Sequence, residues 1–251
     1  AISMPRNLRQ PVEELSPFLQ KQFAGKNRVW RLDKAREDEQ LYRDYVSAYY
    51  ALVEEIDVYI GEIMARLDQL GLSENTIVVY TADHGDFVGA HGMIEKCALG
   101  HNVFEDTLRT PLLFRWPGYI QRNSIRYDLA ELVDIYPTLL DLCGITQPRQ
   151  KHPLQGKSLV KTLTKDVPVG RTFVVSENWS QSTIITDRYK LGVWQKPADG
   201  KHPDFRGFGN MLFDLENDPD EIINIYADAE KVRSELEEQL AEWQHQIMGE
   251  E

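Results

Sequence analysis

The sequence predicts an α/β fold with a smaller antiparallel sheet near the C-terminus. Three observations predict it. A long amphipathic segment over residues 38–72 precedes a short apolar run at Thr76–Tyr80, short β-rich segments fill 172–215, and a second amphipathic segment covers 228–248. The order of helix, turn and buried strand is that of an αβ unit. Short strands separated by turn residues are typical of an antiparallel sheet.

Residues 1–37 are polar and interrupted by prolines, and we expect an extended segment there. From 38 to 72, apolar residues recur at steps of mostly three and four, which predicts one buried stripe on a helix. These residues are Tyr42, Tyr45, Tyr49, Leu52, Val53, Ile56, Ile60, Ile63, Leu67 and Leu70. Gly71 is expected to end this helix.

The run Thr76–Tyr80 is short, rich in β-branched residues and uninterrupted. It predicts a strand covered on both faces, as in a parallel sheet. Pro111–Trp116 predicts a second apolar strand, which Pro117-Gly118 closes. Leu132–Leu142 predicts a helix ended by Gly144.

The character of the chain changes after Leu163, and Lys165–Pro168 is a candidate linker. We therefore predict a core region over 1–165 and a small α+β subdomain over 166–251. The strands expected in that subdomain are Thr172–Ser176, Thr183–Thr186, Tyr189–Trp194 and Met211–Leu215. A helix over 228–248 follows them.

Composition and charge restrict the partners. A formal net charge of −12 leaves no basic surplus for a nucleic-acid backbone or an anionic membrane surface. No run of about 18 apolar residues predicts a membrane span, and the N-terminus has no signal-peptide core. Cys97 and Cys143 are expected to be free thiols, since two cysteines cannot define a disulfide scaffold.

Asp83 and His84 directly follow the first predicted strand. In open α/β sheets, ligands bind at the carboxyl ends of strands. A carboxylate oxygen suits a hard divalent ion, and a neutral imidazole suits a borderline one. The pair is therefore predicted to be part of a divalent-metal site. Two ligands do not fill a coordination shell, so the others must come from elsewhere.

The loop after this pair contains a lysine and two further histidines. Lys96 is a candidate to bind one oxygen of a tetrahedral oxyanion as a compact point charge. His91 and His101 are candidates to contact substrate or leaving group, and a hydrogen-bonded structural role is the alternative for each. Arg109 is expected to be structural and to tie the loop to the next strand.

Six groups of segments, in order along the chain, resemble the sulfatase family of the alkaline-phosphatase superfamily. Asn75–Asp86 is close to the most recognisable motif of that family. The others are Tyr49–Gly61, Arg109–Leu112 with Trp116–Gly118, Val133–Asp141, Gly156–Leu159, and Leu212–Leu215 with Asp218–Glu221 and Asn224. The resemblance implies the C-terminal part of an alkaline-phosphatase-like α/β core, followed by a smaller subdomain of antiparallel sheet and helix.

The resemblance also implies hydrolysis of sulfate monoesters with a divalent metal, usually Ca²⁺, with Mn²⁺ or Zn²⁺ as alternatives. Asp83 and His84 match two of the family's metal ligands. Lys96 best matches its substrate-binding lysine, with His101 as the competing residue. The family often has asparagine where His84 stands, and histidine also occurs among relatives that cleave phosphate or phosphonate esters. A phosphodiester or phosphonate monoester hydrolase is therefore the alternative.

The family's nucleophile is a formylglycine made from the Cys or Ser of a Cys/Ser-x-Pro-x-Arg motif, and no such motif occurs in the sequence. We therefore expect this chain to be the C-terminal part of a longer enzyme and to be inactive alone. The expected partners are the missing N-terminal half and a sulfated small molecule or carbohydrate. A noncatalytic pseudoenzyme chain is the alternative. The family implies a secreted or periplasmic setting, with a cytoplasmic one as the alternative.

Overall fold

The computed structural model describes residues 2–25, 31–32, 34, 36–96, 103–147, 154–178, 180–196, 201 and 204–248. The helices are α1 (Pro17–Ala24), α2 (Glu39–Gln69), α3 (Glu105–Leu108), α4 (Ile135–Leu142), α5 (Val160–Lys165) and α6 (Glu230–Met248). The strands are β1 (Val78–Thr81), β2 (Leu112–Arg115), β3 (Phe173–Asn178), β4 (Gln181–Thr186), β5 (Tyr189–Trp194) and β6 (Met211–Asp214). Short 3₁₀ turns include Val12–Glu14, Ser73–Asn75, Ala90–Gly92, Leu132–Asp134 and Arg206–Phe208.

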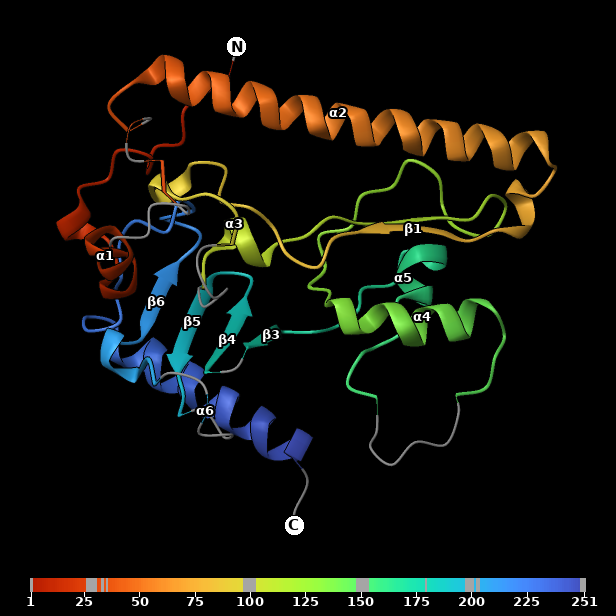
Figure 1. The fold of residues 1–251 in the computed structure, drawn as a ribbon. Coiled ribbons are helices and arrows are strands. Elements are labelled where there is room, and N and C mark those ends of the chain that lie inside the picture. Colours follow the sequence, from red (N-terminus) through yellow and green to blue (C-terminus); the bar gives the residue numbers. More distant parts are fainter. Residues whose placement is uncertain are drawn as a thin grey trace.

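Helix α2 confirms the long predicted helix. Asp38 caps its N-terminus by accepting hydrogen bonds from the backbone N–H of Gln40 and Leu41 at 2.9 and 3.2 Å. The helix extends along the molecule as one continuous rod (Figure 1). Among its residues only Tyr42 and Val46 are buried, and half of its apolar stripe is exposed.

Strands β1 and β2 pair with each other antiparallel, with Val79 opposite Phe114. The expectation of a parallel strand covered on both faces is therefore wrong for the described residues. Tyr80 is 39% exposed and Leu113 is 57% exposed. An apolar run shows that a strand is suited to burial, but it does not encode the direction of its neighbour.

The predicted antiparallel sheet is confirmed, with strand order β3-β4-β5-β6. Alternate residues of its strands enter two different cores, as the period of two in a strand requires. Leu212 packs with Leu191 and with Leu236 of α6 on one face, whereas Phe213 packs on the other face. Helix α6 covers the first face (Figure 1).

The second face is covered by the N-terminal segment and by the loop after β1. Residues 1–37 are not simply extended, because Ser16 caps α1 with Pro17 at its first position. Phe18 of α1 packs against Trp194, with ring centroids 5.6 Å apart. Phe87 and Phe104 also belong to this core. The loop after β1 is thus attached to the C-terminal sheet through apolar contacts.

A buried ion cluster joins the start of α4 to the segment before β3. Asp134 is fully buried and accepts two hydrogen bonds from Arg171 at 2.7 and 2.8 Å, and a third from the backbone N–H of Lys157. Glu131 accepts from the backbone N–H of Val175. Burial raises the pKa of Glu131, although Arg171 nearby acts in the opposite direction. These contacts join residues on both sides of the predicted domain boundary at 165–166. The division of the chain into two domains stays a prediction.

Candidate metal and substrate site

The candidate site begins where β1 ends at Thr81. The backbone N–H of Gly85 donates to the carbonyl of Thr107 in α3 at 2.8 Å. A Cβ atom at Gly85 would lie 2.1 Å from the carbonyl oxygen of Asp106, so only glycine fits there. The loop bearing Asp83 and His84 is therefore pressed against the backbone of α3.

Asp86 shapes the rest of the loop. One of its carboxylate oxygens accepts from the backbone N–H of Val88 at 2.8 Å and of Glu95 at 2.9 Å. Phe87 is buried, and its N–H donates to the carbonyl of Glu95. The loop is therefore folded back on itself, which brings Lys96 next to the Asp83-His84 pair.

Three of the four predicted site residues come together. The side-chain oxygen Oδ2 of Asp83 lies 3.7 Å from Nε2 of His84, and Nζ of Lys96 lies 2.9 Å from the same Nε2. The other ring nitrogen of His84, Nδ1, lies 2.7 Å from the carbonyl oxygen of Gly85. A carbonyl only accepts, so this contact fits a ring protonated at Nδ1 with its lone pair on Nε2.

Asp83 and His84 fit a shared divalent cation. Two ligands each about 2.0–2.4 Å from one ion lie about 3–4 Å apart, and 3.7 Å falls in that range. A backbone acceptor on the opposite ring nitrogen is the usual orienting contact for a metal-binding histidine. The side chain of Asp83 is 88% exposed and is not enclosed by the chain. Across the described ranges, no group of three or more His, Cys, Asp and Glu side chains is suited to a metal.

His91 has the structural role that was its alternative. It is 1% exposed, accepts from Nδ2 of Asn7 at 3.1 Å and donates from Nδ1 to Gln10 at 3.2 Å. Burial lowers the pKa of His91 to about 3, and Arg36 acts in the same direction. His101 and Cys97 lie outside the described residues. Cys143 is a free thiol on the surface.

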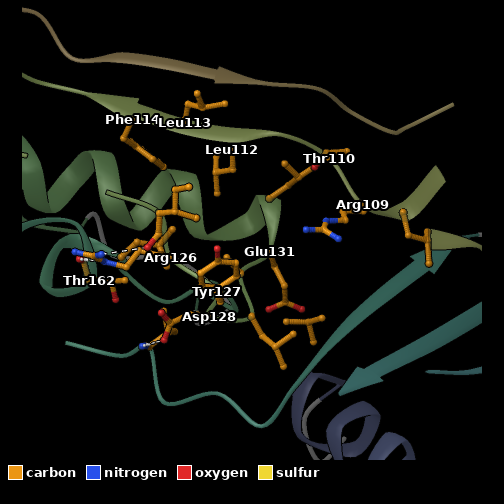
Figure 2. Close-up of a pocket in the computed structure, with 18 of the residues that line it drawn as sticks. Arg109, Thr110, Leu112, Leu113, Phe114, Arg126, Tyr127, Asp128, Glu131 and Thr162 are labelled. Carbon is orange, nitrogen blue, oxygen red and sulfur yellow. Dashed lines mark hydrogen bonds between the residues drawn. The ribbon is translucent and has the colours of Figure 1, made fainter. Parts of the chain in front are cut away.

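A broad open cavity of about 1620 Å³ adjoins Asp83, His84 and Lys96. It exceeds the roughly 300–1,000 Å³ of an ordinary ligand pocket. Leu112 and Phe114 of β2 lie along one side (Figure 2). Much of this wall is the apolar surface of β2. The cavity therefore combines exposed apolar strand surface with the space beside Asp83, His84 and Lys96.

The segment 126–131 forms another part of the cavity wall (Figure 2). Nε of Arg126 donates to the carbonyl of Thr162 at 3.2 Å, and Asp128 accepts from the backbone N–H of Val169 at 2.8 Å. Sequence reasoning did not single out this segment, because its polar residues form no recognisable pattern. Two of its side chains are positioned by contacts with residues 36 and 41 positions away.

Arg109 also lies at the cavity (Figure 2). Its carbonyl oxygen would be 3.2 Å from a Cβ on Gly85, so its backbone packs against the candidate loop. Its side chain belongs to the exposed surface. The expected structural role therefore applies to the backbone of Arg109.

Two family models match the chain. The model described as Sulfatase matches residues 15–145, and the one described as N-sulphoglucosamine sulphohydrolase, C-terminal, matches residues 89–246. The chain belongs to the sulfatase family. Together the two matches cover both the candidate site and the C-terminal sheet, as the resemblance of the motifs predicts.

Curated relatives agree with this assignment. Arylsulfatase K of Bos taurus is 36% identical over 203 residues, which are 76% of this chain and 35% of that protein. The N-acetylglucosamine-6-O-sulfatase of Bacteroides thetaiotaomicron is 30% identical over 224 residues, covering 82% of this chain and 36% of that protein. This sulfatase-family chain thus spans about a third of the length of these relatives.

Solved structures confirm the alkaline-phosphatase-like α/β fold. BT4656 in complex with its substrate D-glucosamine-2-N,6-O-disulfate matches with a TM-score of 0.71 and 28% identity, over 92% of this chain and 45% of that one. The phosphonate monoester hydrolase of Agrobacterium radiobacter matches with a TM-score of 0.66 and 25% identity, over 79% of this chain and 41% of that one. None of the helices in the described part of the chain is long and apolar enough to cross a membrane.

Proposed function

We propose that this chain is the C-terminal part of a metal-dependent sulfatase that hydrolyses sulfate monoesters. Asp83 and His84 are the metal ligands it contributes, and Lys96 contacts the sulfate. The observation that carries the proposal is the convergence of these three side chains after β1, with Nε2 of His84 3.7 Å from Asp83 and 2.9 Å from Lys96. His101 stays the competing candidate for the substrate contact.

A divalent ion, Ca²⁺ by preference, supplies Lewis-acid stabilisation of the nonbridging sulfate oxygens when it is bound. The chain's own residues set up this chemistry. Gly85 orients the ring of His84 through its carbonyl, so that the lone pair is on Nε2, which faces Lys96. Lys96 presents a flexible ammonium group, which can leave Nε2 and stabilise negative charge on the ester oxygens.

The proposed nucleophile is a formylglycine from the N-terminal half of the same enzyme. The exposed apolar stripe of α2 supports this, since Leu52, Ile56 and Ile63 are 50–60% exposed. A stripe of this size on a long helix is normally buried in a core. The chain also spans only 45% of the length of the BT4656 structure. The remaining part of the α/β core is the proposed cover for α2 and for the β1–β2 sheet.

A sulfated carbohydrate is the proposed substrate class. It is supported by the names of two relatives, a bacterial N-acetylglucosamine-6-O-sulfatase and a structure bound to a glucosamine disulfate. The broad cavity beside Lys96 is open enough for a saccharide to approach the candidate ligands.

A phosphonate or phosphodiester hydrolase is the second candidate. His84 favours it, together with the structural likeness to a phosphonate monoester hydrolase. Comparing turnover of an aryl sulfate, an aryl phosphonate monoester and an aryl phosphodiester by the complete protein would decide between them. We expect the highest kcat/KM for the sulfate. A higher value for either phosphorus ester would reverse the assignment.

The metal assignment is tested by Asp83→Asn in the complete protein encoded by the gene. We expect loss of bound metal and at least a 100-fold fall in aryl sulfate turnover, because a neutral amide is a weaker ligand for a divalent ion. Asp228→Asn, at an exposed position in the C-terminal region, is the matched control. Unchanged metal content and turnover in Asp83→Asn would contradict the assignment. Substantial turnover by residues 1–251 alone would contradict the proposal that the nucleophile lies in the N-terminal half.

A further inference from the structure

A fully buried lysine lies behind the candidate site. Lys190 of β5 has a side-chain exposure of 0%, and its ammonium nitrogen is 2.7 Å from Glu105 and 2.6 Å from Glu221. Glu221 is itself buried, with 2% of its side chain exposed. The three residues come from β5, from the first turn of α3 and from the loop after β6. They therefore join three parts of the chain at one point.

The same cluster reaches the backbone of α3. Oε2 of Glu221 accepts a hydrogen bond from the backbone N–H of Glu105 at 2.6 Å. Glu105 is thus held through both its side chain and its backbone. Two residues later, the carbonyl of Thr107 accepts from the backbone N–H of Gly85. A short hydrogen-bonded path therefore leads from Lys190 to the loop bearing Asp83 and His84.

The loop that carries Glu221 is fixed from its other side by the N-terminal segment. Nδ2 of Asn7 donates to the carbonyl of Asp220 at 3.0 Å, and Nε2 of Gln10 donates to the carbonyl of Ile222 at 3.1 Å. Glu221 has a φ of 52°, a conformation that non-glycine residues adopt only when their surroundings impose it. The position of Glu221 is therefore fixed by the N-terminal segment as well as by Lys190.

Resting on the proposed function, we propose that Lys190, with Glu105 and Glu221, is a positioning residue for the metal site. The cluster fixes the position of α3. Helix α3 in turn holds the Asp83-His84 loop through the Thr107 carbonyl and the backbone that packs on Gly85. An ammonium group with three donors can satisfy two carboxylates in only a narrow range of geometries. An apolar residue in its place would fill the space but would not fix the direction of α3.

The first test removes the charges and keeps the volume. The triple variant Lys190→Met, Glu105→Gln, Glu221→Gln leaves no uncompensated buried charge, so it is expected to fold. In the complete protein we expect the Kd for Mn²⁺, used as the probe metal, to rise about tenfold, the size typical of lost outer-shell support. We also expect kcat for an aryl sulfate to fall by a similar factor with little change in KM.

A second measurement does not depend on catalysis. Amide hydrogen exchange at Gly85, whose N–H is bound to Thr107, is expected to speed up about tenfold in the triple variant. Glu105→Ala provides a milder variant, because this side chain is 35% exposed and Lys190 keeps Glu221 as a partner. It is expected to change exchange at Gly85 in the same direction.

The double variant Arg171→Met, Asp134→Asn is the matched control, since it removes both charges of another buried ion pair. We expect it to lower stability without changing exchange at Gly85 or the Mn²⁺ Kd. Unchanged exchange and Kd in folded triple and Glu105→Ala variants would overturn the positioning role. If Asp83→Asn leaves turnover intact, the proposed function fails. Exchange at Gly85 still measures whether the Lys190 cluster holds the Asp83-His84 loop in place.

Discussion

The β3–β6 sheet buries apolar residues on both of its faces, whereas α2 exposes half of its apolar stripe. Ile184, Leu191 and Leu212 of the sheet are each 0% exposed. In α2, Leu52 and Ile63 are each 60% exposed. The two regions have equally regular apolar patterns, so the difference lies in what covers them. The sheet finds its cover within this chain, in α6 and in the loop after β1.

This difference separates a region whose apolar residues are covered within this chain from one whose apolar residues are exposed. The sequence pattern of α2 specifies a buried face, and a pattern of that kind reports the environment in which a helix is stable. On the proposal above, that environment is the rest of the sulfatase core. The candidate loop is attached to the β3–β6 sheet through the packing of Phe87 and Phe104.

The largest expected effect comes from a matched pair of leucines. In the 251-residue chain, Leu212→Ala is expected to lower the free energy of unfolding by about 2–5 kcal/mol, because it leaves a cavity in a closed core. Leu52→Ala, at a 60% exposed position, is expected to change it by less than about 0.5 kcal/mol. Denaturant unfolding of both variants measures the two effects.

The same two substitutions, made in the complete protein, test whether α2 is covered there. If the rest of the core covers α2, Leu52→Ala should then cost about 2 kcal/mol or more. A cost that stays below about 0.5 kcal/mol would show that α2 remains uncovered, and the proposed docking of the core onto α2 would be wrong. Leu212→Ala should cost the same in both contexts.

Much of the fold follows from local patterns. The structure has β5 at Tyr189–Trp194, with the bounds that the sequence predicts, because turns flank a short strand there. The sequence does not predict helix α1, although Ser16-Pro17 is a helix-start signal, because eight residues are too few to show a clear period. The antiparallel pairing of β1 with β2 depends on tertiary contacts that apolar composition does not encode.

The candidate site divides in the same way. Asp83 and His84 were predictable because they are adjacent and follow a strand. Lys96 approaches His84 because Asp86 accepts two backbone hydrogen bonds that fold the loop back. The sequence does not indicate these two bonds. Lys190 was not predictable as part of the same structure, since its partner Glu105 is 85 residues away.

An intermediate effect is expected from acid at the junction between the two regions. His91 is neutral in the folded chain, where burial lowers its pKa to about 3 from an ordinary value of 6.5. The unfolded chain therefore binds a proton first as pH falls, and the stability from His91, which is full above pH 6.5, is lost towards pH 3. Between pH 6.5 and 5 the expected loss is about 2 kcal/mol.

The measurement is denaturant unfolding of the wild type and of His91→Gln at several pH values. Glutamine removes the titrating ring, so the difference in stability between the two proteins isolates the contribution of His91. We expect that difference to shrink steadily on acidification from pH 6.5. A difference independent of pH would mean that burial does not hold His91 neutral in the folded chain.

The smallest expected effect concerns the N-terminal cap of α2. Because few side chains of α2 pack on the rest of the chain, its local interactions should matter more than those of a buried helix. Asp38→Ala removes the acceptor for the backbone N–H groups of Gln40 and Leu41 and is expected to cost about 1 kcal/mol, with a fall in helical circular dichroism. Asp57→Ala, at an exposed position inside the same helix, should change stability by less than about 0.5 kcal/mol. Equal effects of the two substitutions would show that α2 is held by packing, and the contrast with the β3–β6 sheet would then be smaller than the exposure of its apolar residues indicates.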